Sequence, residues 1–163
     1  MEDNKILRIV YTFFLGILLA IFVGVGINTF YAPPPAPKYP VELNTYGKEM
    51  TEKQLTVQQE FDRADEAYLE KMKPYNRNVS VITMAAAVTL LTVSMVFEKR
   101  MKIIADGVML GGLFTLFYSI GRGFASENSK YVFAVVTIGL ILVLYLGYHR
   151  FVKPHQPATA AKK

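Results

Sequence analysis

The sequence predicts an all-α integral membrane protein with four transmembrane helices. Hydrophobic residues make up 52% of the 163 residues, and charged residues make up only 19%. The apolar residues fall into four blocks of about the 20 residues that a helix needs to cross a bilayer. Shorter alternating segments, which are typical of a transmembrane β-barrel, do not occur.

The first block covers residues 6–31 and defines an N-terminal unit, residues 1–31. It resembles a signal peptide in having Lys5 and Arg8 ahead of an apolar stretch, but this stretch is longer than the usual apolar core of about 7–15 residues. Cleavage after Ala32 would place Pro33 directly after the scissile bond. We therefore expect an uncut transmembrane anchor rather than a cleaved signal peptide.

The other three blocks cover residues 79–97, 103–121 and 131–151. Short connections join them, which predicts a three-helix antiparallel membrane unit over residues 79–153. The tail, residues 154–163, is rich in Pro, Ala and Lys, and its composition predicts disorder.

Orientation follows from the basic residues. Each predicted side of the membrane carries nine Lys or Arg residues, but those on the side of the termini are concentrated close to the ends of the spans. Basic residues near span ends favour the cytoplasm. We expect both termini in the cytoplasm, and we expect the membrane to be a plasma membrane of the bacterial inner-membrane type. The positions of the basic residues suit lipid headgroups, and we expect no nucleic-acid partner.

The first and second spans are joined by an extracytoplasmic segment, residues 32–78. It begins with a Pro-rich spacer that holds five of the eight prolines and favours polyproline II. Thr51 and Gln54 form a capping-box pattern that predicts a helix start. Pro74 predicts the end of this helix, which we place at about residues 52–73.

This helix is amphipathic. Its apolar stripe has helical spacing, while Asp62, Glu66 and Glu70 occupy another face. The acidic face argues against a helix that lies on lipid. The stripe must therefore be covered by another part of this chain, a second copy or a separate partner. The predicted partner-binding residues are Val57, Phe61, Tyr68 and Met72.

Small residues recur every four positions in two spans, which is typical of closely packed membrane helices. We expect them to pack helices within the bundle, with homodimer formation as the alternative. The predicted packing residues are Gly16, Ala20 and Gly24 in the first span and Gly107 and Gly111 in the third.

Asp106 is the one ionisable residue well inside an apolar block. An acid in a membrane span is a candidate ion-coupling residue. Because Asp106 lies one turn beyond Lys102, we favour an anchor near the membrane surface, whose side chain would either reach the surface itself or pair with Lys102 or Arg100. At the other end of the third span, Arg122 is expected to meet headgroups or Glu127.

Groups that carry catalysis are missing from the sequence. No Cys occurs, which excludes disulfide scaffolds and thiolate sites. No nucleotide-binding or hydrolase motif occurs, and His149 and His155 lack metal-ligand spacing. We expect neither enzyme activity nor a cofactor or metal. The pattern favours a non-enzymatic accessory or assembly protein that docks a partner through the extracytoplasmic helix. The alternative is a small transporter or channel subunit that uses Asp106.

Overall fold

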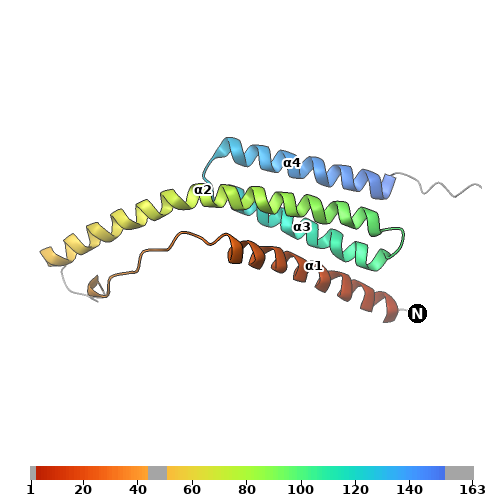
Figure 1. Ribbon diagram of the computed structural model, residues 1–163, viewed down its shortest axis with the longest axis horizontal. Helices are drawn as coiled ribbons and strands as arrows, with labels where there is room; N and C mark the ends of the chain where they lie inside the picture. Colours follow the sequence, from red (N-terminus) through yellow and green to blue (C-terminus); the bar gives the residue numbers. More distant parts are fainter. Residues whose placement is uncertain (1–2, 44–50, 153–163) are drawn as a thin grey trace, which may run out of the picture.

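The computed structural model describes residues 3–43 and 51–152, and the regular structure in these ranges is entirely helical (Figure 1). Four of its helices are long and apolar enough to cross a membrane. The predicted tail, residues 154–163, lies outside the described residues. The elements are α1 (Asp3–Phe30), η1 (Val41–Leu43), α2 (Glu52–Phe97), α3 (Lys102–Phe124), α4 (Ser129–Gly147) and a π turn, η2 (Tyr148–Val152).

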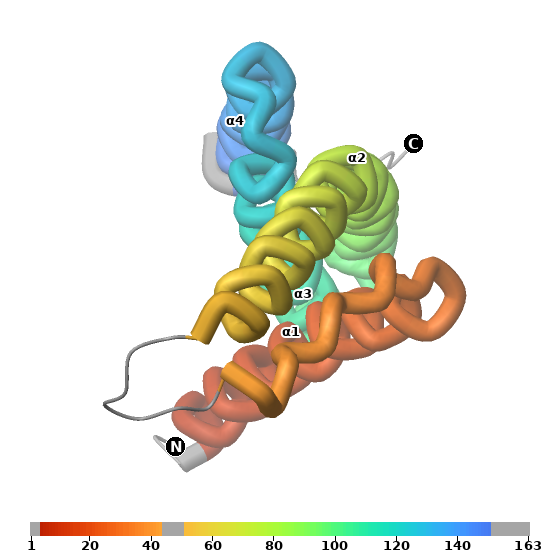
Figure 2. The backbone as a smooth tube through the Cα atoms, turned by 90° about the vertical axis from the view of Figure 1, so that its left-hand side faces the viewer, coloured from red at the N-terminus to blue at the C-terminus, as the bar shows by residue number. Residues whose placement is uncertain are grey.

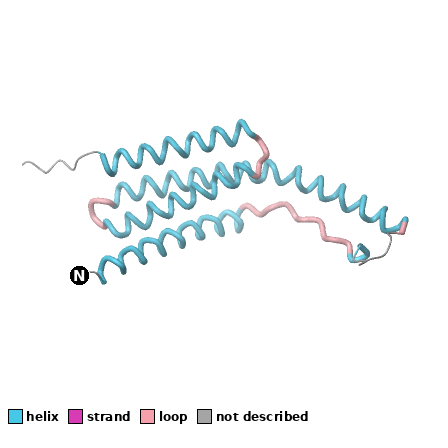
Figure 3. Tube along the Cα trace, turned by 180° about the vertical axis from the view of Figure 1, so that it is seen from behind, coloured by secondary structure: helices cyan, strands magenta, loops and turns pink. Residues whose placement is uncertain are grey.

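The helices α2, α3 and α4 follow one another in antiparallel order through short turns (Figure 3). Helix α3 is central: it packs against α2, α1 and α4, and α1 and α4 lie on opposite sides of it (Figure 2). The start of α1, the α2–α3 turn and η2 therefore share one end of the bundle, which we call the terminal end. The end of α1 and the α3–α4 turn share the other end, which we call the arm end.

Small polar residues line the contact between α2 and α3. Ser80 and Ser119 are fully buried, and each hydroxyl donates a 2.8 Å hydrogen bond to the backbone carbonyl of the other residue. Ser94 donates to the Ala105 carbonyl at 3.0 Å. These bonds satisfy hydroxyl groups that are buried from solvent, and the small side chains let the two backbones approach closely.

Glycines allow a similarly close contact between α1 and α3. A Cβ atom added at Gly107 would lie 2.6 Å from the Leu15 side chain, and one at Gly16 would lie 3.0 Å from Leu110. Gly111 receives Leu19 in the same way. Three of the predicted packing glycines thus lie between α1 and α3. Gly24 has no such neighbour within 4 Å, and Ala20 is half-buried on α1.

The prediction that Pro74 ends a helix is wrong, because α2 runs unbroken through it for 46 residues. A proline inside a helix removes one backbone hydrogen bond and costs about 3 kcal/mol. Burial of Tyr75, Asn76 and Val79 immediately after the proline offsets this cost by tertiary packing. Helix α2 changes direction between its two halves (Figure 1).

The first half of α2 projects away from the other three helices at the arm end (Figure 1). At about 1.5 Å per residue, the 46 residues of α2 span about 69 Å, more than twice a hydrocarbon core of about 30 Å. We call residues 52–73 the arm. The helix begins at Glu52 as predicted, and Gln54 accepts a hydrogen bond from the Thr51 backbone N–H at 3.0 Å.

Candidate functional site

The Pro-rich spacer, residues 32–43, runs from the end of α1 outward along the arm, antiparallel to it (Figure 1). Tyr31, at its start, stacks on Tyr75 with ring centroids 5.2 Å apart. Farther along, Tyr39 meets Phe61 edge to face at 5.4 Å, and near the tip the Glu42 carbonyl accepts from the Gln54 side chain at 3.0 Å. The spacer therefore packs on the arm at two levels, and the Tyr31–Tyr75 stack lies just beyond the base of the arm.

The spacer covers part of the stripe that the sequence singled out for a partner. All four predicted residues, Val57, Phe61, Tyr68 and Met72, are half-buried, and Phe61 has Tyr39 as its aromatic neighbour. Of the three covers that the sequence left open, another part of this chain is the one that contacts Phe61. At Phe61, therefore, the apolar stripe is covered by the spacer of the same chain.

A different face of the arm remains open. Residues 55, 62, 66 and 69 are spaced seven, four and three apart, which places them on one side of the helix. Leu55 and Leu69 are 47% and 51% exposed, large fractions for leucines outside the apolar blocks. Asp62 and Glu66, between them, are also exposed. We call these four residues the free face; it is acidic, and a leucine lies near each of its ends.

The base of the arm is held by polar contacts from α3 and the α3–α4 turn. Arg122 donates to the side-chain amide oxygen of Asn76 at 2.8 Å and to the Tyr118 hydroxyl at 2.9 Å. Asn76, which is buried, in turn donates to the Ala125 carbonyl at 3.1 Å. The guanidinium also lies over the Tyr75 ring at 5.9 Å. Arg122 therefore bonds Asn76 and Tyr118, and the predicted contact with Glu127 does not form.

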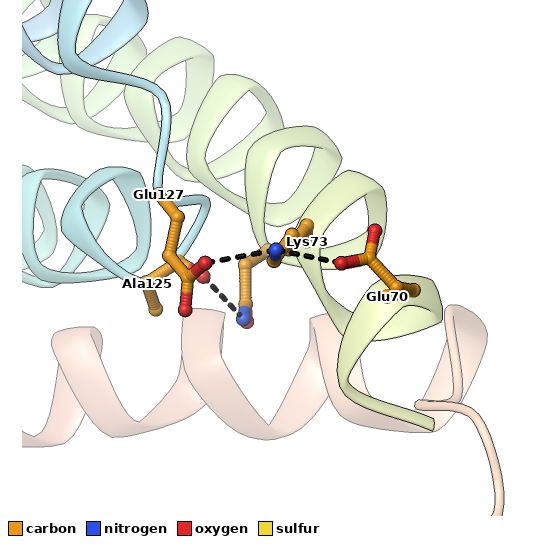
Figure 4. Close-up of polar contacts among 5 residues, drawn as sticks. Glu70, Lys73, Ala125 and Glu127 are labelled. Atoms are coloured by element: carbon orange, nitrogen blue, oxygen red, sulfur yellow. Dashed lines mark hydrogen bonds and ion pairs between the residues drawn. The ribbon is translucent and has the colours of Figure 1, made fainter. Parts of the chain in front are cut away.

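Glu127 instead pairs with Lys73, the last residue of the arm. The Lys73 ammonium lies 2.9 Å from Glu127 and 2.8 Å from Glu70 (Figure 4). The hydrogen bonds that Lys73 donates to these two carboxylates, Glu70 first, raise the pKa of Lys73 to about 12. Glu127 also has a φ of 54°, which is unusual for a residue other than glycine. The ion pair thus joins the α3–α4 turn to the arm directly beside Pro74.

At the terminal end, Asp106 forms an ion pair with Arg150 of η2. The Arg150 side chain is only 10% exposed, and its Nη1 also donates to the Met109 sulfur at 3.0 Å. The predicted pairing with Lys102 or Arg100 is therefore wrong. Helix α4 returns to the terminal end beside α3 and delivers Arg150 there, which places a cation closer to Asp106 than its neighbours in sequence.

Sequence reasoning missed the contacts of Arg150 and Asn76, of Tyr31 directly before the spacer, and of Tyr39 within it. Tyr31 and Tyr39 lie near the two ends of the proline run, and this placement was the available signal that the run packs against something. Within residues 3–43 and 51–152, no group of three or more His, Asp and Glu residues is placed to hold a metal ion. Every buried side-chain polar atom in these ranges has a hydrogen-bond partner.

Comparisons with known proteins do not assign the chain to a class. No protein-family model matches it, and no curated protein or solved structure is significantly similar to it. The geometry of the arm and of the two bundle ends therefore carries the functional argument.

Proposed function

We propose that the chain is a non-enzymatic, membrane-integral accessory or assembly protein whose arm docks a protein partner. Its four apolar helices would cross a plasma membrane of the bacterial inner-membrane type, with both termini in the cytoplasm and the arm outside. The observation that carries this proposal is the unbroken course of α2 from the bundle into the arm. A continuous helix held at its base presents a surface at a fixed height and direction, whereas a flexible loop does not.

The free face indicates the chemistry of the partner. Two exposed leucines supply apolar contact area, and because each is already about half-buried, burying the rest of each would contribute about 0.8–1.5 kcal/mol. Asp62 and Glu66 between them favour a basic surface, because complementary charge speeds encounter and selects partners. We therefore expect a partner, or a partner segment, that is basic and carries apolar side chains.

The alternative, a transporter or channel subunit, needs a carboxylate that is free to exchange ions. Asp106 lies near the terminal end, and Arg150 already neutralises it. The hydroxyl groups buried between α2 and α3 bond to backbone carbonyls. These contacts favour a packing role for the bundle over an ion pathway.

Site-specific photocrosslinking in intact cells tests the docking role. A photoreactive residue at Leu69 should give one discrete adduct, and Asp62→Lys with Glu66→Lys should abolish it. The control is a photoreactive residue at Phe117, which is 77% exposed on α3 and should give no such adduct. An adduct of twice the 18.3 kDa chain mass would identify a second copy instead of a partner. Absence of any adduct at Leu69 and Leu55 would reject the docking role.

Orientation is tested separately with single cysteines, since the chain has none of its own. A cysteine at Lys38 or Ser129 should react with an impermeant reagent in intact cells, and one at Lys99 should not. The reverse result would place the arm in the cytoplasm.

A further inference from the structure

The surface of the bundle has an open cavity of about 840 Å³ at its terminal end, far from the arm. Helix α1, the α2–α3 turn and the start of α3 form its walls. Its inner lining is mostly apolar and includes Ile9, Phe13, Ile103 and Leu110. A cavity of this kind beside a lipid-facing helix is open to an acyl chain.

The polar part of the lining is strongly basic. Arg8, Arg100 and Lys102 contribute three cations, whereas Asp106 contributes the one carboxylate. Arg150 already neutralises Asp106 from outside the lining. Among the described residues, none of the three cations forms an ion pair of its own. The cavity therefore carries unbalanced positive charge at its rim.

The start of α3 adds to this charge. The first N–H groups of a helix have no partner within the helix, and they carry a partial positive charge. Met101, at the N-cap position, supplies no side-chain hydrogen bond to them. Lys102, Ile103 and Ile104 of this first turn all line the cavity. The backbone thus favours an anion at the same place as the three side chains.

We propose that this cavity binds an anionic phospholipid, with the phosphate held between Arg8, Arg100 and Lys102 and an acyl chain on the apolar lining. A basic pocket between membrane helices on the cytoplasmic side suits such headgroups. A zwitterionic lipid would bring a cation of its own to the rim and should bind more weakly. The inference rests on the membrane insertion and orientation proposed above, but not on the docking role of the arm.

Native mass spectrometry of the full chain in neutral detergent tests the proposal. The parent protein, titrated in parallel with phosphatidylglycerol and phosphatidylcholine, should retain phosphatidylglycerol preferentially. The triple variant Arg8→Gln, Arg100→Gln, Lys102→Gln should retain at least about tenfold less of it.

The matched control removes the same charges, two Arg and one Lys, at the arm end. This variant, Arg63→Gln, Arg77→Gln, Lys130→Gln, should retain phosphatidylglycerol as the parent does. The proposal would be overturned if both triple variants lost phosphatidylglycerol equally, or if the variant of Arg8, Arg100 and Lys102 lost none. It would also be overturned if the parent showed no preference for the anionic lipid.

A second variant keeps the test valid if the triple variant does not fold. Thr12→Trp adds volume to the cavity wall without changing charge, and it should also lower phosphatidylglycerol retention. Extraction of the parent from membranes by alkaline carbonate would reject membrane insertion itself. If the photoreactive residue at Leu69 gives no adduct while the protein still retains phosphatidylglycerol, only the docking role is rejected.

Discussion

Gly112 offers the sharpest test of the packing between α2 and α3. A Cβ atom at this position would lie 2.8 Å from Leu91 Cδ2, 2.9 Å from Leu91 Cγ and 3.2 Å from the Leu91 backbone nitrogen. Leu91 is 5% exposed, so it has little room to move away. The substitution Gly112→Ala therefore forces either an unfavourable Leu91 conformation or a shift of the α2 backbone.

The effect of Gly112→Ala on the free energy of unfolding is the balance of two opposing effects. Alanine favours a helix over glycine by about 1 kcal/mol, whereas overpacking a filled site costs about 1–3 kcal/mol. Gly24→Ala is the matched control, because its Cβ would meet nothing within 4 Å and only the helix preference remains. We expect Gly112→Ala to have a free energy of unfolding about 1–3 kcal/mol below that of Gly24→Ala.

Equilibrium unfolding in mixed micelles, with rising sodium dodecyl sulfate, measures this difference. A double-mutant cycle with Leu91→Ala then assigns it: the coupling energy should be favourable, because the methyl group that Gly112→Ala adds can occupy space that the truncated Leu91 side chain leaves. Equal stability of Gly112→Ala and Gly24→Ala, or a coupling energy near zero, would refute the assigned contact.

Two further predictions concern the ion pairs. Asp106→Asn should lower the free energy of unfolding in detergent by about 1–2 kcal/mol. This is less than the about 3–5 kcal/mol lost when a fully buried pair is broken, because the Asp106 side chain is 33% exposed. An unchanged free energy of unfolding would contradict a stabilising role of the pair. Lys73→Gln should lower the thermal unfolding temperature by the same amount at pH 7 and pH 9. Because the pKa of Lys73 is raised from 10.5 to about 12, its stabilising contribution is complete below pH 10.5 and is lost as the pH rises through about 12. A contribution that declines already between pH 7 and pH 9 would contradict the pairing.

The helices themselves could be predicted from the sequence because their signal is local. A block of about 20 apolar residues identifies a candidate span without knowledge of its neighbours. The predicted span 103–121 differs from α3 only at its ends, Lys102 and Phe124, whereas the predicted span 79–97 is the second part of α2, which begins at Glu52 and ends at Phe97. The capping-box pattern located the start of the arm at Glu52.

The continuation of α2 past Pro74 could not be predicted, because it depends on contacts between residues that are distant in sequence. Pro74 is a strong local signal for a helix end, but Asn76 bonds Ala125 and Lys73 pairs with Glu127 across the α3–α4 turn. The partner of Asp106 is likewise 44 residues away. The packing of α4 against α3 brings Asp106 and Arg150 together in space, and periodicity within one helix carries no information about that packing.

The contacts around Pro74 decide whether residues 52–73 act as a docking arm or as a simple tether. A tether needs a joint where the arm meets the bundle, and proline, with its missing hydrogen bond, is the natural place for one. Here Tyr31, the residue after α1, stacks on Tyr75 on the bundle side of the proline, and the α3–α4 turn contacts the arm through Glu127 and Lys73. Movement of the arm about Pro74 would break the ion pair between Lys73 and Glu127. This ion pair and the unbroken course of α2 favour a fixed position of the arm, as the proposed docking role requires.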